Sequence, residues 1–527
     1  MDGQVVVPVT PAACVVPPKP TTRSWKVKLL LLLVCFACAI FTQYQSVAPC
    51  LFIFHATYLS FIHIEKSFWK AYLASLFLSF GLALSMSQVF RADTADPTSW
   101  DWFSAGICLG IQAGVMHAFF LFALINKRLA SISSKNLLVF CYPVLVTTAY
   151  TIASLYTPIA SQASMAYALS EWLSFVQIVS VFGLSGLNFV IVLTSACIAH
   201  YYVIDEWNER KNFASRLGFF VFILTWLFGS FRLAAPFIYQ RGVEEIAPST
   251  SQLVKGACIT GDGQPDVVLA ATTKLLTEQP DTKFVVWSEA AGGTVYDDTV
   301  GGVWKPSQQP RLSNLLSEVT SLAQASDATI LITYLTWAYP NDVNDAHVLN
   351  KLTVVSASEN KSFTKRFPVP VIENDVIAGD NDLLTVAQSP VGGFNAGICY
   401  DLDHPAFVRS GLSSGLLVQS ANTWGVVGHF HAISSSFRAI ENGVFLLRCG
   451  SNGPSGIYDP YGQSLLYDVR KDAGVMTFHL PQSPERLWTF YSNAGFVIDY
   501  VLFVAAGFFI LLFVMSFKRS LRVRALH

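Results

Sequence analysis

Apolar residues concentrate in two parts of this chain, before about residue 240 and after about residue 494. Crossing a bilayer as a helix takes about 20 predominantly apolar residues. Apolar runs of this kind, bounded by charges or by Pro, Asn and Ser clusters, predict about eight membrane spans, of which the first two are short. The predicted spans are Leu29–Tyr44, Ala48–Ile64, Phe68–Phe90, Trp102–Ile125, Leu137–Tyr156, Leu173–His200, Leu217–Tyr239 and Ala494–Phe517.

Between these regions, from about Leu253, short β-rich runs alternate with amphipathic helical stretches. Helices are predicted for VVLAATTKLLTE and LSNLLSEVTSLAQAS. Strands are predicted for LVKGACIT, KFVVWSE, ATILITYLTW, HVLNKLTVVSAS, FNAGICYDLD, GLLVQSAN, GVFLLRCGS and SGIYDPYG. This alternation is typical of an α/β domain or of one with α-β-β-α layers. At roughly 240 residues, the stretch is long enough for one domain with its own core.

Composition agrees with a chain that is partly solvated by lipid. Of the 527 residues, 52% are hydrophobic and only 13% are charged, and the mean hydropathy is +0.45. A soluble protein of this size needs more charge to cover its surface. The net charge of −1 gives no reason to expect nucleic acid as a partner.

Basic residues flank alternate ends of the spans, so they indicate orientation. By the positive-inside rule, the segments that carry them are cytoplasmic. These residues are Arg23, Lys26, Lys28, Lys66, Lys70, Lys127, Arg128, Lys135, Arg210, Lys211, Arg216, Lys518, Arg519, Arg522 and Arg524. We therefore predict a disordered cytoplasmic tail at 1–28, seven spans within 29–240, a non-cytoplasmic domain at 250–487, a last span at 494–517 and a basic cytoplasmic tail at 518–527.

Only three of the ten cysteines fall in the soluble domain, namely Cys258, Cys399 and Cys449. Three is an odd number, so at least one thiol there is free unless it pairs between molecules. The sequence leaves open whether Cys258 and Cys449 pair with each other.

Candidate catalytic groups stand at the ends of apolar strands, where α/β sheets place ligands and reactive groups. Glu289 ends one such strand and Cys399 directly follows another, while Lys365 and Glu373 lie between them in a proline-rich segment. A carboxylate can take the proton of a thiol, and an ammonium can stabilise both the thiolate and an oxyanion. A single cysteine after a strand is more often structural, so the assignment depends on these residues together.

Other motifs do not lead to a site. The chain has no GxSxG sequence, which disfavours a Ser-His-Asp hydrolase. His429 and His431 have no third ligand at a recognisable spacing, so neither a metal nor a cofactor is expected. Asn360-Lys-Ser is a glycosylation sequon that matters only in a eukaryotic source.

Three motifs occur in the order found in the nitrilase superfamily. WSE at Trp287–Glu289, K-R-x-x-V-P-x-x-E at Lys365–Glu373 and GICYD around Cys399 resemble the Glu-Lys-Cys triad segments of that superfamily. The arrangement of eight spans with the domain inserted before the last resembles the apolipoprotein N-acyltransferase family. The expected fold is therefore a multispanning α-helical bundle of about eight spans plus a nitrilase-like α-β-β-α domain.

The resemblance also implies roles for individual residues. Glu289 would be the general base, Lys365 the oxyanion stabiliser and Cys399 the nucleophile. Glu373 would support the lysine, and Tyr400 would line the pocket. In that family, an acyl chain passes from a phospholipid to the cysteine as a thioester, and then to the amine of a lipoprotein's N-terminal cysteine. We expect a monomer integral to the membrane, in the inner membrane of a bacterium or in an endomembrane or plasma membrane of a eukaryote.

Some positions depart from the family pattern. Asp401 stands where the acyltransferases usually have Glu, and Ile372 stands where Gly is usual. The first strand of the domain also lacks the asparagine–glutamine pattern of the bacterial enzymes. These departures leave the acceptor open. Two alternatives remain, a membrane-anchored amidase that acts on a carbon–nitrogen bond and a non-catalytic scaffold.

Overall fold

The computed structural model describes most of the chain. The described residues are 25–42, 47–87, 102–130, 135–204, 210–244, 253–261, 263–296, 311–338, 347–356, 360–370, 372–423, 425–470 and 473–525. The predicted disordered tail lies outside them as far as residue 24.

Helices lie at every position where a span is expected. They are α1 (Trp25–Ile40), α2 (Ala48–Ile64), α3 (Phe68–Ser87), α4 (Trp102–Leu129), α5 (Lys135–Tyr156), α7 (Val179–Ala199), α8 (Arg210–Glu244) and α13 (Phe490–Ala525). Within the described residues, six are long and apolar enough to cross a membrane: α3, α4, α5, α7, α8 and α13. The first two helices, with 16 and 17 residues, are shorter than a typical span.

The span expected at residues 173–200 is not one continuous helix. The short α6 (Leu173–Val176) precedes α7, and within α7 Gly183 has φ +63°, outside the helical region. A Cβ atom at Gly183 would lie 2.3 Å from the ring of Tyr491 in α13. Glycine is needed here for both reasons, because other residues rarely adopt this φ and would collide with the neighbouring helix. The sequence pattern missed the break because both halves are equally apolar.

The soluble domain contains two sheets. The first, with seven strands, has the order β13-β1-β2-β4-β5-β6, and β3 pairs with β4; the second, with six, has the order β12-β11-β10-β9-β8-β7. The first comprises β1 (Leu253–Thr260), β2 (Thr282–Trp287), β3 (Thr294–Val295), β4 (Thr329–Ala338), β5 (His347–Val355), β6 (Asn360–Thr364) and β13 (Gly474–Pro481). The second comprises β7 (Leu384–Val386), β8 (Phe394–Ile398), β9 (Leu416–Asn422), β10 (Phe445–Ser451), β11 (Gly453–Tyr458) and β12 (Ser464–Arg470).

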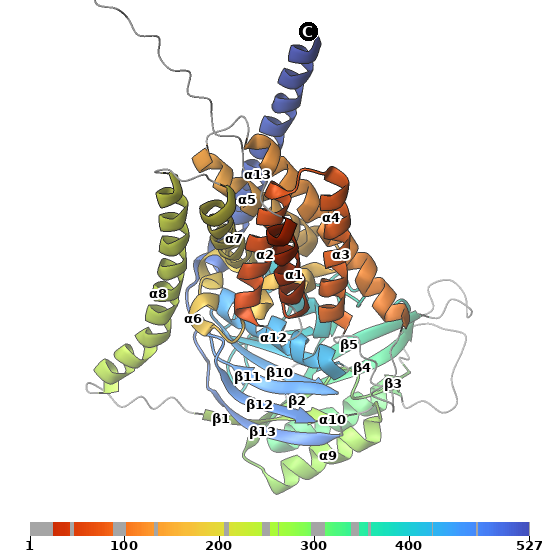
Figure 1. Ribbon diagram of the computed structural model, residues 1–527. Coiled ribbons are helices and arrows are strands. Elements are labelled where there is room, and N and C mark those ends of the chain that lie inside the picture. The colour runs from red at the N-terminus through yellow and green to blue at the C-terminus, as the bar shows by residue number, and fades with distance from the viewer. Residues whose placement is uncertain are drawn as a thin grey trace, which may run out of the picture.

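Apolar side chains between the sheets form the core of the domain. Phe284 of the first sheet meets Phe394 of the second edge to face, with ring centroids 5.3 Å apart. On the outer face of the first sheet pack α9 (Pro265–Glu278) and α10 (Leu312–Ser326). The outer face of the second sheet carries α11 (Pro405–Gly411) and α12 (Gly425–Asn442). The predicted α-β-β-α layering is confirmed, and Figure 1 shows α9 and α10 on the side away from the bundle.

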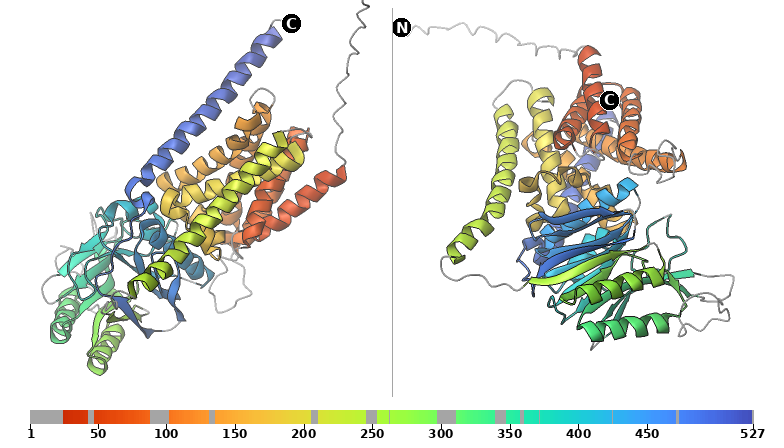
Figure 2. Two further views of the ribbon diagram at one scale, coloured as in Figure 1. Left: turned by 90° about the vertical axis from the view of Figure 1, so that its left-hand side faces the viewer. Right: turned by 90° about the horizontal axis from the view of Figure 1, so that it is seen from below.

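Helix α12 lies between the second sheet and the helical bundle. Phe437 and Ile440 of this helix belong to the same buried cluster as the bundle's side chains. The ring of Tyr167, in the short helical turn η2 (Met165–Leu169) between α5 and α6, packs edge to face on Phe437 at 4.9 Å. The bundle therefore rests directly on the domain, and the C-terminal end of α13 projects from the opposite end of the bundle (Figure 2).

Candidate active site

The candidate base and nucleophile come from opposite sheets of the domain. Glu289 lies just after β2 in the first sheet, and Cys399 opens the 3-10 turn η4 (Cys399–Asp403) directly after β8 in the second. The backbone N–H of Glu289 donates to the carbonyl oxygen of Ala421 in β9 at 3.3 Å. This bond joins the ends of the two sheets, so the side chains that follow β2 and β8 face one another.

Lys365 lies between two carboxylates. It directly follows β6, and its Nζ lies 2.8 Å from Oε1 of Glu289 and 2.7 Å from Oε1 of Glu373. The Lys365 side chain is fully buried, and that of Glu289 is only 5% exposed. A buried ammonium is tolerated only with such hydrogen-bonded partners, so the carboxylates hold Lys365 in its charged form.

Two asparagines that the sequence analysis missed also donate hydrogen bonds to the carboxylate of Glu289. Nδ2 of Asn350 in β5 donates to Oε1 of Glu289 at 2.8 Å, and the backbone N–H of Asn422 donates to Oε2 at 2.8 Å. Asn350 is buried in β5, which also contains His347, Lys351 and Thr353. No local pattern therefore marked Asn350, although a buried amide needs hydrogen-bond partners.

Cys399 is buried and its backbone is strained. Its φ is +46°, in the left-handed region that residues with a Cβ rarely adopt. Its Sγ lies 3.9 Å from the carbonyl oxygen of Asn422, and its thiol lies near enough to the Glu289 carboxylate to help lower the pKa of that carboxylate. The strained turn thus aims the sulfur at the carboxylate and lysine that the sequence motifs had singled out.

Burial and neighbouring charges set the protonation states. Burial, followed by the charge of Glu289, raises the pKa of Cys399 well above its ordinary value, and Lys365 opposes this only in part. Burial alone would raise the pKa of Glu289, but the charge of Lys365 and the hydrogen bonds to the carboxylate together outweigh burial and hold that pKa below the usual value. Burial alone would lower the pKa of Lys365, yet the surrounding anions raise it. The resting site therefore contains a thiol, a carboxylate and an ammonium.

Tyr400 and Asp401 have structural contacts that the sequence did not predict. The hydroxyl of Tyr400 lies 2.9 Å from the carbonyl oxygen of Pro158 and 2.8 Å from that of Ile159, both in the turn that follows α5 of the bundle. Asp401 accepts the backbone N–H groups of Arg366, Phe367 and Ile398 at 3.0, 2.8 and 3.1 Å. Burial raises the pKa of Asp401 to about 7, although Lys365 and these N–H groups oppose the rise.

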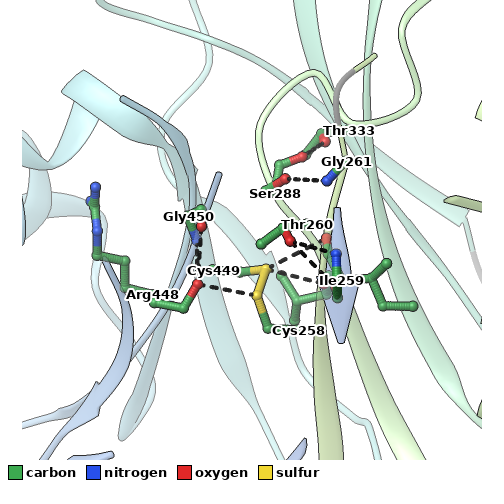
Figure 3. The surroundings of a disulfide bond; sticks show 12 residues. Cys258, Ile259, Thr260, Gly261, Ser288, Thr333, Arg448, Cys449 and Gly450 are labelled. Atoms are coloured by element: carbon green, nitrogen blue, oxygen red, sulfur yellow. Dashed lines mark hydrogen bonds between the residues drawn. A yellow bond between two sulfur atoms is a disulfide. The ribbon is translucent and has the colours of Figure 1, made fainter. Parts of the chain in front are cut away.

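The two remaining cysteines of the domain form a disulfide. Cys258 of β1 and Cys449 of β10 are bonded, and their Cα atoms are 5.4 Å apart. Figure 3 shows the bond crossing from one sheet to the other. Cys399 is left as a free thiol. The pairing that the sequence left open thus links the two sheets and leaves the candidate nucleophile unpaired.

The two histidines of α12 have separate surroundings. Nδ1 of His429 lies 2.7 Å from the Tyr467 hydroxyl at the surface, whereas Nε2 of His431 lies 2.9 Å from Oδ2 of Asp403 inside the domain. Among the residues that the structure describes, no group of three or more His, Cys, Asp or Glu side chains is arranged to hold a metal ion.

Comparison with known proteins agrees with this architecture. The family model described as "Carbon-nitrogen hydrolase" matches residues 264–472. The chain contains a carbon-nitrogen hydrolase domain. Apolipoprotein N-acyltransferase from Gloeobacter violaceus is 26% identical over 323 residues, which cover 57% of this chain and 58% of that protein. The corresponding protein from Pseudomonas aeruginosa is 24% identical over 259 residues, which cover 42% of this chain and 47% of that protein. The predicted resemblance to this family is confirmed, and the chain spans about half the length of these curated relatives.

The chain is also similar to proteins outside the acyltransferases. Omega-amidase NIT3 from Saccharomyces cerevisiae is 24% identical over 242 residues, covering 42% of this chain and 81% of that protein. Its solved structure aligns with a TM-score of 0.34 at 18% identity, over 44% of this chain and 90% of that one. An amidase from Nesterenkonia sp. aligns with a TM-score of 0.36 at 16% identity, over 47% of this chain and 95% of that one.

Proposed function

We propose that this protein is a membrane N-acyltransferase, with Glu289, Lys365 and Cys399 as its catalytic residues. It would move an acyl chain from a phospholipid to an amine, for which the N-terminal cysteine of a lipoprotein is the first candidate. The observation that supports this best is the contact of Tyr400, beside the nucleophile, with the backbone of Pro158 and Ile159 in the bundle. A nucleophile that adjoins membrane helices suits an acyl donor that resides in lipid.

The first half-reaction would form a thioester. Glu289 takes the proton of the Cys399 thiol as the sulfur attacks the ester carbonyl carbon of the phospholipid. The carbonyl oxygen becomes an oxyanion beside the Lys365 ammonium, which stabilises it. When the tetrahedral intermediate collapses, the carbon–oxygen bond breaks and the departing alkoxide takes the proton back from Glu289. The products are acyl-Cys399 and a lysophospholipid.

The second half-reaction would pass the acyl group to an amine. The neutral amine attacks the thioester carbonyl, and Lys365 again stabilises the oxyanion. Glu289 accepts a proton from the attacking nitrogen and delivers it to the departing Cys399 thiolate. An amide bond forms as the carbon–sulfur bond breaks, which restores the resting thiol, carboxylate and ammonium.

The domain would face the non-cytoplasmic side. Two observations support this orientation. Lys28 and Lys127, from separate predicted cytoplasmic segments, meet at one end of the bundle, where Lys28 Nζ lies 3.0 Å from Oε2 of Glu65 and Lys127 Nζ lies 2.8 Å from the Ile62 carbonyl oxygen. In addition, the Cys258–Cys449 disulfide is of the kind that persists in oxidising compartments.

Cysteine labelling tests this orientation. We expect Ser321→Cys, at an exposed position of α10, to react with a membrane-impermeant maleimide in intact cells. The matched variant Lys518→Cys, at the far end of α13, should react only after permeabilisation. The opposite labelling pattern would contradict the orientation.

An amidase is the second candidate. It is favoured by the similarity to omega-amidase NIT3, which covers 81% of that protein, whereas the similarity to the first acyltransferase covers 58%. In this case water would replace the amine, and the substrate would be an amide.

A transfer assay separates the two functions. The purified full-length protein is incubated in detergent–lipid micelles with phospholipid carrying a labelled acyl chain and with a peptide bearing a diacylglyceryl-cysteine N-terminus. An acyltransferase gives labelled peptide and lysophospholipid, and the Cys399→Ala variant gives neither. Failure of the wild-type protein to label the peptide or release lysophospholipid, with hydrolysis of a simple amide instead, would favour the amidase.

A further inference from the structure

The turn that carries Cys399 is held by buried polar side chains that the proposed mechanism does not use. The carbonyl oxygen of Cys399 accepts a hydrogen bond from Nε2 of Gln419 in β9 at 2.8 Å. Oε1 of the same amide accepts from Nη1 of Arg448 in β10 at 2.8 Å. Both side chains are fully buried. The strained residue is thus linked through one glutamine to a buried guanidinium.

From Arg448 the contacts return to the other end of the same turn. Nη2 of Arg448 lies 3.3 Å from Nδ1 of His431, and Nε2 of His431 lies 2.9 Å from Oδ2 of Asp403. Ser434 donates to Oδ1 of Asp403 at 2.7 Å. Asp403 is the last residue of η4, of which Cys399 is the first. The contacts therefore close a ring around the nucleophile turn.

Hydrogen-bond chemistry fixes the direction of two links. A guanidinium can only donate, so Nδ1 of His431 accepts from Arg448, whereas Nε2 of His431 and Oδ2 of Asp403 are in close contact without a well-aligned hydrogen bond. Burial alone would raise the pKa of Asp403, but His431 and Ser434 outweigh it and hold that pKa below the usual range, which keeps the acceptor ionised. Gln419 likewise can satisfy both neighbours only with its oxygen toward Arg448 and its nitrogen toward Cys399.

We propose that Gln419, Arg448, His431 and Asp403 form a positioning ring that holds Cys399 in its attacking conformation. This inference rests on the proposed role of Cys399 as nucleophile. A left-handed backbone at a residue with a Cβ persists only where its surroundings impose it. The ring contacts both ends of the turn and so holds the left-handed backbone at Cys399. The charge of Arg448 also favours the thiolate that forms during attack.

Substitution of Gln419 tests the ring at its contact with Cys399. Gln419→Glu keeps an acceptor for Arg448 but has no donor for the Cys399 carbonyl, and Gln419→Met removes both contacts at similar volume. We expect either change to slow thioester formation by on the order of tenfold to a hundredfold, because small displacements of a nucleophile have effects of this size. The KM for phospholipid should stay within about twofold, since the proposed ring acts on the turn that carries Cys399 and not on binding of the acyl donor.

His431→Phe tests the far side of the ring, and His429→Phe is the matched control. His429 lies two positions away on α12, is exposed and contacts only the Tyr467 hydroxyl among the hydrogen bonds of the described residues. We expect His431→Phe to slow thioester formation to a similar extent and His429→Phe to leave it unchanged. The ring would be overturned if Gln419→Glu and His431→Phe formed the thioester at the wild-type rate. It would also be overturned if the loss of rate only matched the fraction of unfolded protein.

A second measurement keeps the ring testable if acyl transfer fails. The rate at which iodoacetamide alkylates Cys399, mapped by peptide mass spectrometry, depends on the turn but not on any lipid. If wild type forms no thioester, the proposed function is wrong. The ring still stands if Gln419→Glu and His431→Phe change the alkylation rate at least about tenfold while His429→Phe does not, and it falls if all three behave as wild type.

Discussion

Among the described residues, the buried ion pairs around Lys365 and around Arg438 differ in how their charges are satisfied. In the first, Lys365 contacts carboxylate oxygens of Glu289 and Glu373 at 2.8 and 2.7 Å, and Glu289 has further donors. In the second, Nε of Arg438 lies 3.1 Å from Oε2 of Glu441 on α12, and both side chains are fully buried. Within the described part of the chain, no nitrogen of Arg438 has a well-aligned hydrogen bond.

The second cluster joins the domain to the bundle. Oε1 of Glu441 accepts the backbone N–H of Leu184 at 3.2 Å, just after the break at Gly183 in α7. That N–H is among those freed where the helix is interrupted, and a carboxylate at such a position is stabilised by the helix dipole. The contrast fits the proposed catalytic role of the cluster around Lys365, whereas the cluster around Arg438 contacts both the domain and the bundle.

Removing the lysine should have the largest effect on turnover. Lys365→Met removes the cation that would stabilise the oxyanion, so we expect turnover per folded molecule to fall by on the order of a hundredfold to a thousandfold. Circular dichroism checks folding, and Lys274→Met, an exposed lysine of α9, is the matched control. Turnover above one tenth of wild type would place the chemistry elsewhere.

Breaking the second cluster should affect stability more than chemistry. Glu441→Gln leaves the buried Arg438 without its anion and should lower the free energy of unfolding by about 3 kcal/mol. Glu278→Gln, which breaks an exposed pair with Lys274 at 4.0 Å, should change it by less than about 0.5 kcal/mol. Denaturant titration in detergent measures both. Equal effects of the two variants would mean that the Arg438–Glu441 pair does not hold the domain and the bundle together.

The pH dependence of Cys399 reactivity tests the charges of the first cluster. Because the pKa of the thiol is raised above 9.0, the thiolate is a minor form at neutral pH and its fraction grows as the pH rises. The alkylation rate with iodoacetamide should therefore increase about tenfold per pH unit from pH 6 to pH 9 without a plateau. A plateau below pH 8 would show that the resting site holds a thiolate.

The smallest expected effect concerns the contact between the nucleophile turn and the bundle. Tyr400→Phe removes the hydroxyl that faces Pro158 and Ile159 and should lower turnover about three- to tenfold, the effect of losing one net hydrogen bond. Tyr467→Phe, which removes a surface hydroxyl that faces His429, is the control. If Tyr400→Phe behaves like this control, the bundle does not position the turn through that contact.

Much of the fold follows from local pattern. The strand at Leu253–Thr260 and the helix at Leu312–Ser326 occur as predicted, because period and flanking polar residues mark them clearly. Helix α12 was missed although it carries His431 of the ring and the Arg438–Glu441 pair. Its run of serines has low helix propensity, and the helix is stabilised by packing between the second sheet and the bundle, which no local pattern records.

The site could be predicted only in part for a similar reason. Glu289, Lys365 and Cys399 stand in short motifs at strand ends, so their order in the chain was informative. Asn350 and Gln419 stand in no recognisable motif, and they acquire their partners only when distant parts of the chain come together. The break at Gly183 likewise depends on the approach of Tyr491 from the last helix.

Intact-mass spectrometry of the full-length protein after incubation with phospholipid tests the central claim most directly. The account predicts a mass increase of one acyl chain on Cys399 that hydroxylamine removes, that Cys399→Ala abolishes, and that forms in step with lysophospholipid. An unmodified Cys399, in protein that is folded and still reacts with iodoacetamide, would contradict it.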